Sequence, residues 1–514
     1  AITADGRFKY AINSSNGLRD NSVNDMFVDS QNKVWLATDN GITLLETNSE
    51  LSFFNYTNGI WGAVLSIQRY RGQLYVGTSV GLFRYNEAES RRGLIRSFSR
   101  VRGIEDNCWQ LRVYKNRLFA VGNEGLFLVS GNGLTKIVSG RFQSMLDTEI
   151  HSKDMVLLAG ESGVTLLEFA DSAIVNYGEL ANLPYPVRTL ALDDFGNIWL
   201  GTDRNGLFVT NFPDSVSLDV QVTEFGEGSG VSAEVGWVDV VKTSRLGVLF
   251  STPMGIYRYS YGSQSFVKDT VFFCGNYHSS AVYTPLMEDK DKNILYSCSF
   301  ADIYEREIAV MRFTENNNFS LYKLPFGQLR ESIIESIYPV EGGVVWFGTA
   351  DALIKYEPRG NAEVLLEDAF NCIIKSVKIS NDSTVFSFER DSDIRSAKPF
   401  ELSYSNKMLR FEVAGLSYNT FGETEYQYFL EGFDDKWSEW TCDAFKEYTS
   451  LIEGRYNLKV RARNGYGQVS NVAEIRFVVK PPYYRTIFAY ILYVFLFWGT
   501  LVVIVSWRNI SHAQ

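Results

Sequence analysis

Histidine, cysteine and proline are scarce in this chain of 514 residues, and the shortages exclude several kinds of site. With only three histidines, a histidine-based metal site or catalytic triad would have to use His151 or His278, whose sequence neighbours supply no partner pattern. The five cysteines form no C-x-x-C pair, and they are interpreted as buried small hydrophobic residues rather than as metal ligands. We therefore expect no metal site, no cofactor and no catalytic residues.

Positive charge is also in short supply. Lys and Arg total 49 against 60 Asp and Glu, a formal net charge of −11. This balance excludes a duplex-DNA-binding surface for the chain as a whole, because such surfaces are strongly basic. Only 11 prolines accompany 41 glycines, and aromatic residues make up 15% of the chain. Many aromatics and glycines are typical of an all-β protein with tight turns, and they argue against disorder.

One phrase recurs along the first three quarters of the chain: an apolar strand, a small-residue turn, a glycine and a second apolar strand. The copies follow one another about every 40 to 50 residues, the period of a β-propeller with four short strands per blade. A four-stranded sheet cannot bury both faces alone, whereas a closed ring of sheets does so. The copies are Val34–Glu46, Leu74–Asn86, Leu118–Ser130, Val156–Glu168, Ile198–Thr210, Val248–Ser260, Leu295–Glu307 and Val345–Glu357.

These eight copies predict a single propeller over residues 1–375 with eight blades, and seven blades plus a decorated insertion is the alternative. Leu51–Tyr56 is predicted to be the outer strand of the first unit. Phe8–Ile12 is predicted to be the outer strand of the last blade, which would close the ring. The Asp194–Trp199 turn resembles the Asp-box of sialidases, which is structural in many propellers, and no other copy is predicted to carry it. We therefore interpret it as structural rather than catalytic.

The pattern changes in the last quarter of the chain. Residues 376–398 are polar and charged, and they are predicted to form a strand plus a linker. Longer strands with one apolar and one charged face follow, most clearly at Tyr456–Arg463. Residues 399–482 are therefore expected to form an immunoglobulin-like sandwich. Trp437 and Trp440 are interpreted as residues of its core or of a domain seam rather than as ligand contacts.

The chain has one long run without charge, residues 486–507, which Arg485 and Arg508 bracket. The run is long enough to cross a hydrocarbon core of about 30 Å as a helix, and aromatic residues stand at both expected interface levels. We predict one transmembrane helix here, with residues 508–514 as the start of a cytoplasmic segment. The flanking positive charges favour neither orientation.

Specific motifs in both β regions resemble known families. The second region resembles the triple-tyrosine (Y_Y_Y) domain in its Y-x-Y-x-L-E-G core at Tyr426–Gly432, its G-R-Y strand at Gly454–Tyr456 and its P-P-Y-Y entry into the membrane at Pro481–Tyr484. The upstream copies resemble regulator-propeller repeats, whose hallmark is W-x-G-T-x-x-G-L. Ile198–Leu207 is the best match to that hallmark.

The order of these parts resembles the periplasmic sensor region of Bacteroidetes-type membrane regulators, among them hybrid two-component sensors of polysaccharide utilisation and relatives with a helix-turn-helix output. The resemblance implies a periplasmic location for residues 1–485, a single pass through the inner membrane and a homodimer. Two departures stand out. Many such sensors carry two consecutive propellers, whereas this chain has room for one, and no kinase, phosphoacceptor or DNA-binding segment follows Trp507. Any output activity is expected beyond residue 514.

A ligand is expected on the propeller face that carries the loops entering the inner strands and the turns between second and third strands. Aromatic residues stack on sugars, and Arg and carboxylates hold hydroxyls or anions, so an oligosaccharide or an envelope protein is the expected ligand, and nucleic acid is not. The alternative is a non-catalytic scaffold subunit whose propeller docks envelope proteins. The candidate ligand residues are Arg19, Trp61, Trp109, Tyr185, Arg188, Arg204, Trp237, Tyr277 and His278, with Asp39 and Glu124 beside them.

Overall fold

The computed structural model divides the chain into two compact units, residues 1–362 and 363–514. It describes residues 12–14, 18–29, 33–45, 49–86, 97–131, 133–170, 173–183, 185–212, 215–225, 229, 231, 236–269, 271–272, 281–300, 306–313, 319–322, 326–329, 332–358, 370–379, 383–388, 399–404, 408–417, 424–465 and 468–511.

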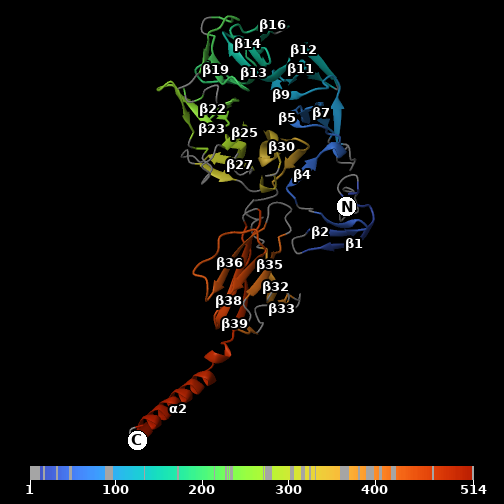
Figure 1. The fold of residues 1–514 in the computed structure, drawn as a ribbon. Coiled ribbons are helices and arrows are strands. Elements are labelled where there is room, and N and C mark those ends of the chain that lie inside the picture. The colour runs from blue at the N-terminus through green and yellow to red at the C-terminus, as the bar shows by residue number, and fades with distance from the viewer. Residues whose placement is uncertain are drawn as a thin grey trace. The chain divides into compact units, whose positions relative to one another are not determined.

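Seven antiparallel four-stranded sheets form the blades of a propeller in the first unit (Figure 1). Along the chain, blade 1 contains β5 (Val64–Tyr70), β6 (Gln73–Thr78), β7 (Gly81–Tyr85) and β8 (Phe98–Val101), and blade 2 contains β9 (Cys108–Tyr114), β10 (Arg117–Gly122), β11 (Gly125–Ser130) and β12 (Gly133–Val138). Blade 3 contains β13 (Phe142–Ile150), β14 (Lys153–Gly160), β15 (Gly163–Phe169) and β16 (Ile174–Glu179), and blade 4 contains β17 (Val187–Leu192), β18 (Ile198–Thr202), β19 (Leu207–Thr210) and β20 (Val222–Glu224). Blade 5 contains β21 (Asp239–Thr243), β22 (Gly247–Thr252), β23 (Gly255–Ser260) and β24 (Ser265–Lys268), and blade 6 contains β25 (Ala281–Glu288), β26 (Ile294–Phe300), β27 (Arg306–Phe313) and β28 (Phe319–Tyr322). Blade 7 contains β29 (Ile334–Pro339), β30 (Val345–Thr349), β31 (Leu353–Tyr356) and β4 (Leu51–Phe54).

The ring closes through β4, which precedes blade 1 in sequence but pairs antiparallel with β31 of blade 7. Each inner strand packs beside the next, from β5 through β29, and β29 packs against β5 again. The ring therefore has seven blades, and the predicted count of eight is corrected to the alternative of seven. The assignment of Leu51–Tyr56 to the first unit was wrong, because its strand fills the outer position of the last blade. Phe8–Ala11, predicted for that position, lies outside the described residues.

The first copy of the repeated phrase, which begins at Val34, lies outside this ring. It falls in a separate three-stranded sheet of β1 (Val23–Val28), β2 (Val34–Thr38) and β3 (Gly41–Leu45). The side chains of β1 are exposed on both faces, including Met26 and Phe27. The blade phrase thus specifies a local sheet of blade type, whereas membership of the ring depends on packing against neighbouring blades.

Close approach between neighbouring blades explains the glycine of the repeated G-T pair. A Cβ atom on Gly201 would lie 2.2 Å from the carbonyl oxygen of Val238, in the next blade, and one on Gly348 would lie 2.4 Å from that of Val64. The threonine that follows caps the turn to the third strand, since Thr202 Oγ1 donates a hydrogen bond of 2.8 Å to the Gly206 carbonyl. The phrase therefore encodes both blade contact and turn geometry.

The junctions between blades bury most of the apolar side chains of the unit. Between blades 4 and 5, for example, Trp199 contacts the rings of Phe225, Phe250, Tyr259 and Phe266. Polar contacts from the hairpins between first and second strands add a link at each of the seven junctions. These contacts are Tyr70 to the Asn116 carbonyl, Tyr114 to Asp154, His151 to the Phe212 carbonyl, Asp194 to Lys242, Ser244 to Glu288, Lys290 to Glu341, and the Arg69 amide to Tyr338.

The second unit is a sandwich of two four-stranded sheets. Its first sheet, in the order β33-β32-β35-β37, consists of β33 (Ser383–Ser387), β32 (Cys372–Ile379), β35 (Met408–Gly415) and β37 (Phe445–Thr449). Its second sheet, in the order β34-β39-β38-β36, consists of β34 (Phe400–Leu402), β39 (Ala473–Val479), β38 (Gly454–Arg463) and β36 (Glu425–Glu431). The expected boundary is corrected, because β32 pairs with β35 and β33 pairs with β32, so both strands belong to the sandwich rather than to the end of the propeller or a linker.

Tyrosines fill much of the sandwich core, and their hydroxyl groups find backbone partners. Tyr428 donates to the Asp443 carbonyl over 2.7 Å, Tyr456 donates to the Ile452 carbonyl over 3.0 Å, and Tyr426 accepts from a backbone N–H. The rings supply buried apolar area, and the hydrogen bonds remove the cost of burying a hydroxyl group. This pairing explains why the domain uses tyrosine rather than phenylalanine at these positions.

A 3₁₀ turn, η7 (Tyr483–Arg485), leads from β39 into the helix α2 (Ile487–Ser511). Residues Ile487–Arg508 of this helix are long and apolar enough to cross a membrane, and none of that stretch is buried in protein. The predicted span of 486–507 therefore coincides with a helix that exposes apolar side chains on every side. Such a surface suits a lipid environment.

Candidate functional site

The candidate ligand residues lie at the propeller face defined by the loops entering the inner strands and the turns between second and third strands, here called the entry face. Arg188 at the start of β17 is the best-connected of them. Its guanidinium pairs with Asp203, 3.2 Å away in the turn after β18, and with Asp239, 3.0 Å away on β21 of the next blade. The guanidinium carbon lies 5.7 Å from the centre of the Trp237 ring. The structure thus brings Arg188 and Trp237 together across the junction between blades 4 and 5.

Asp239 is the buried member of this group. Its other carboxylate oxygen accepts a hydrogen bond of 3.2 Å from Thr284 Oγ1 in blade 6. Burial raises the pKa of the Asp239 carboxyl, and the charge of Arg188 opposes that shift. The carboxylate links three successive blades, because it holds an arginine from blade 4 and a threonine from blade 6.

Two further predicted residues surround this group. Tyr185 is half-buried and stacks on Phe208 with ring centres 5.3 Å apart. Arg204 is exposed in the turn next to Asp203. Blades 4 and 5 therefore carry Tyr185, Arg188, Arg204 and Trp237 on one rim of the ring, with a mixture of aromatic and charged groups.

The other predicted residues do not join this group. Trp61, before β5, contacts Tyr56 with ring centres 5.8 Å apart, and Trp109 on β9 donates a hydrogen bond of 2.8 Å to Asn123. Blades 1 and 2 stand across a seven-membered ring from blades 4 and 5, so these tryptophans line a different part of the face. Arg19 precedes the separate β1–β3 sheet and is not part of the ring.

The remaining candidate ligand residues do not extend the group around Arg188 on the entry face. Tyr277 and His278 lie outside the described residues. Asp39 accepts a hydrogen bond of 2.7 Å from Asn24 within the β1–β3 sheet, and Glu124 accepts one of 3.1 Å from the Glu105 amide in blade 2. Among the residues that the structure describes, no group of three or more His, Cys, Asp or Glu side chains could hold a metal ion.

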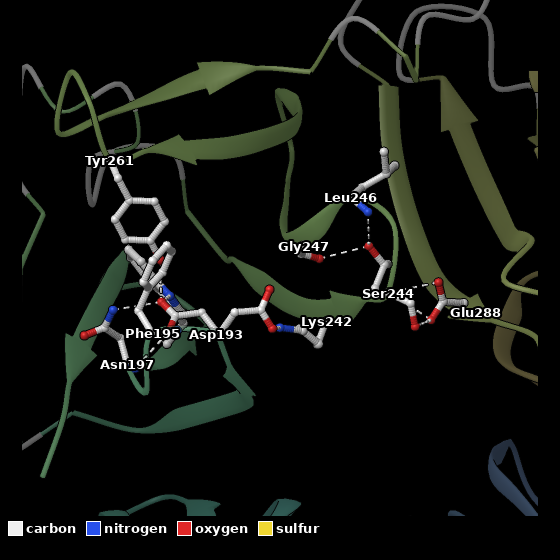
Figure 2. A network of polar contacts seen from close by, with 12 residues as sticks. Asp193, Phe195, Asn197, Lys242, Ser244, Leu246, Gly247, Tyr261 and Glu288 are labelled. Atoms are coloured by element: carbon white, nitrogen blue, oxygen red, sulfur yellow. Dashed lines mark hydrogen bonds and ion pairs between the residues drawn. The ribbon is translucent and has the colours of Figure 1, made fainter. Parts of the chain in front are cut away.

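A second cluster, which the sequence analysis missed, lies on the opposite face, where the hairpins between first and second strands project. Its centre is Asp193 in the β17–β18 hairpin, shown in Figure 2. Its carboxylate accepts hydrogen bonds from the amides of Phe195 and Asn197, from the Trp199 indole at 2.9 Å and from the Tyr261 hydroxyl. Burial acts to raise the pKa of Asp193, but these hydrogen bonds outweigh it and hold the pKa below its usual range.

This turn corrects two points of the Asp-box reading. The capping carboxylate is Asp193, whereas Asp194 is exposed and pairs with Lys242 of blade 5. The turn is also present elsewhere, since Asp29 accepts from the Lys33 amide and the Trp35 indole, and Asp289 accepts from the amide and side chain of Asn293. The sequence pattern that marks this turn is an aspartate followed four positions later by the residue whose amide it accepts, and six positions later by a tryptophan or leucine.

A cleft of about 450 Å³ opens beside Asp193, between blades 4 and 5. The exposed rings of Phe195 and Tyr261 stand at one side, their centres 4.5 Å apart. Leu246 and Gly247, from the hairpin of blade 5, line the other side (Figure 2). The cleft lies away from the predicted entry-face residues, so the propeller presents two distinct candidate surfaces.

The tryptophans of the sandwich lie on the outer face of a sheet. Trp437 and Trp440 are half-buried beneath Arg461, whose guanidinium carbon lies 4.6 and 5.5 Å from their ring centres. Arg463 stacks on Trp440 at 4.4 Å and pairs with Glu425 at 2.6 Å. Of the two expected places, the sandwich core is wrong, because alternate arginines of β38 cover the indoles from the outside, and the domain seam stays a prediction.

Comparison with known proteins tests the family resemblance. Residues 417–480 match the Y_Y_Y domain, and residues 17–40 match the Two component regulator propeller family. The chain carries both family motifs. The Y_Y_Y match covers most of the sandwich, and the regulator-propeller match falls on β1 and β2. The resemblance stated from the sequence is thus confirmed.

Two longer proteins resemble most of the chain. Histidine kinase P4 of Formosa agariphila is 22% identical over 331 residues, which make up 62% of this chain and 23% of the kinase. The solved extracellular domain of BT3049, described as a hybrid two component system of B. thetaiotaomicron, superposes with a TM-score of 0.67 at 17% identity, over 93% of this chain and 64% of that one. The second likeness shows a shared fold. The chain spans less than two thirds of either protein.

Proposed function

We propose that this chain is the periplasmic sensor region of a membrane-anchored signal-transduction regulator. The observation that carries the proposal is the order of its parts: a regulator-type propeller, a Y_Y_Y sandwich and an apolar helix long enough to span a membrane. In this arrangement residues 1–485 lie in the periplasm, α2 crosses the inner membrane once, and the output activity belongs to a segment beyond residue 514. The region itself acts by binding rather than by catalysis, and it works as a homodimer.

The ligand, an oligosaccharide or an envelope protein, binds at the entry face around Arg188 and Trp237. This rim combines an indole ring with a guanidinium that two carboxylates hold in place, so its polar groups are oriented before a ligand arrives. Tyr185 and Arg204 extend it on blade 4. Trp61 and Trp109, on the far side of the ring, offer separate aromatic contacts for a larger ligand.

The sandwich passes the response to the membrane helix through a short connection. Arg485 at the end of η7 pairs with Glu453 of the sandwich over 2.9 Å, and Lys480, which follows β39, pairs with Glu401 of β34. The pairing with Arg485 holds the pKa of Glu453 below its usual range, so the contact stays charged at neutral pH. A ligand shifts such a system only if it binds one arrangement of the dimer better than the other.

Calorimetry on the full chain in lipid nanodiscs tests the ligand part of the proposal. Titration with a panel of neutral and acidic oligosaccharides and with envelope-protein fractions is expected to give a binding partner whose affinity falls at least tenfold in Arg188→Ala and Trp237→Ala. Phe319→Ala serves as the matched control, because Phe319 is a partly exposed aromatic residue on blade 6 away from the rim. Equal affinity of all three variants for every bound partner would contradict the assignment of this rim.

A further inference from the structure

The cleft between blades 4 and 5 on the face opposite the entry face has features that packing does not explain. Phe195 exposes 71% of its surface and Tyr261 exposes 45%, whereas the nearby rings of Trp199 and Phe250 are buried. Large aromatic residues left exposed beside a cavity are typical of binding sites rather than of ordinary surface. The cleft volume of about 450 Å³ falls within the range of small-molecule sites.

The same carboxylate anchors the Tyr261 ring and the backbone that carries Phe195. Asp193 accepts the Tyr261 hydroxyl from blade 5 and, over 2.9 Å, the backbone amide of Phe195 from its own turn. The two ring centres lie 4.5 Å apart with their planes inclined by 57°, so the pair presents an angled aromatic wall. Because Asp193 already holds the Tyr261 hydroxyl, a ligand that stacks on this wall pays less of the entropic cost of ordering that ring.

The charged groups of the cleft are largely balanced. Asp194 and Lys242 of the lining form an ion pair 2.5 Å apart, and Arg258 pairs with the buried carboxylate of Asp269. Lys268 also lines the cleft, and its charge is offset by that of Asp193, which is already engaged by its hydrogen-bond donors. The lining therefore offers separate donors and acceptors to hydroxyl groups, without the excess of one charge that an acidic or basic ligand would require.

We propose that this cleft binds a neutral sugar ring of a saccharide. The face of a pyranose ring presents C–H groups that fit the wall of Phe195 and Tyr261, while its rim hydroxyls reach the Asp194–Lys242 pair and Ser260. The inference rests on the proposed function in treating a saccharide as the ligand, but it assigns the contact to a different face from Arg188 and Trp237. The two surfaces would allow one long saccharide, or two short ones, to be bound independently.

The test uses the full chain in nanodiscs with neutral gluco-, galacto-, manno- and xylo-oligosaccharides, and with oligogalacturonate and alginate oligosaccharides as acidic probes. A neutral oligosaccharide is expected to bind and to lose at least tenfold in affinity in Phe195→Ala. The affinity should be retained in Phe319→Ala, a matched exposed phenylalanine of blade 6. Phe195→Leu, which keeps the apolar volume but removes the aromatic face, is expected to lose most of the affinity as well.

Each other outcome overturns the inference in a way that separates it from the proposed function. A neutral saccharide whose binding depends on Trp237 and not on Phe195 would place it on the entry face, leaving the proposed function intact. Failure of every neutral probe to bind would refute the cleft assignment. The proposed function would then stand only if an acidic saccharide or an envelope protein bound in a manner dependent on Arg188 or Trp237.

Discussion

Asp193→Ala is expected to weaken the junction between blades 4 and 5 far more than the same change in a sister turn. The substitution removes the acceptor for the buried Trp199 indole, for the Tyr261 hydroxyl and for two backbone amides. Asp289→Ala is the matched control, because Asp289 forms the same turn in blade 6 but accepts only from the amide and side chain of Asn293.

The magnitude follows from the groups left without partners. A hydrogen bond to a charged group contributes about 1.5–3 kcal/mol, and an unpaired buried donor such as the Trp199 indole costs about 1–3 kcal/mol. Because these contributions overlap, we expect Asp193→Ala to lower the free energy of unfolding by about 3–5 kcal/mol and Asp289→Ala by about 1–2 kcal/mol. With a urea dependence of about 3 kcal/mol per molar, the midpoint of the propeller transition should fall by about 1–1.7 M in Asp193→Ala and by at most about 0.7 M in Asp289→Ala.

The pH dependence of this difference provides a second readout. Since the pKa of Asp193 is lower in the folded state than in the unfolded chain, the carboxylate stabilises the fold above the usual Asp range and loses that effect as pH falls through the folded pKa. Urea denaturation read by near-ultraviolet circular dichroism should show a constant gap between wild type and Asp193→Ala from pH 7 down to about 4, narrowing below. Equal losses in the two alanine variants, or a gap that widens in acid, would refute the reasoning.

Further substitutions test the blade contacts and the cysteines. Gly201→Ala is expected to cost about 1–3 kcal/mol in the same denaturation assay, because its Cβ would meet backbone of the next blade, whereas Gly133→Ala, with open space, should change stability by less than about 1 kcal/mol. Exposed Cys442 should react with maleimide within minutes at pH 8, as peptide mapping by mass spectrometry would show. Cys108 and Cys372, whose pKa burial raises to about 12, should react only after unfolding, so rapid labelling of either would contradict the packing of its unit.

The repeated phrase predicted the blade strands well because its determinants are local. In the copy Leu74–Asn86, for example, the two apolar strands of the phrase correspond closely to β6 and β7. The phrase could not reveal which sheets join the ring, because Val34–Glu46 has the same local pattern as a ring blade. Closure by β4 depends on pairing with a strand some 300 residues later, and local periodicity carries no such information.

The entry-face prediction grouped residues by their place in the repeat, which fixes the face but not the position around the ring. Arg188 and Trp237 meet because they belong to successive blades, whereas Trp61 and Trp109 belong to blades on the far side. The opposite-face cleft was missed because Tyr261 reaches Asp193 from another blade, across 68 positions of sequence. The spacing of Asp193, Asn197 and Trp199 can be read from the sequence. The residues of blade 5 that complete the cleft around Asp193 cannot.

The pairing of β4 with β31 also determines how the propeller carries mechanical load. Because the strands are antiparallel, Leu51, where the chain enters the ring, lies opposite Tyr356, where the chain leaves it. The chain therefore enters and leaves the ring at the same end of one strand pair. A force applied between the segment before Leu51 and the segment after Tyr356 acts first on the pairing of β4 with β31. Force applied at the same end of two antiparallel strands breaks their hydrogen bonds one after another rather than all together. Under such a force, β4 separates from β31 one residue pair at a time, from Leu51 toward Phe54. The other six blades bear no load until β4 has separated completely.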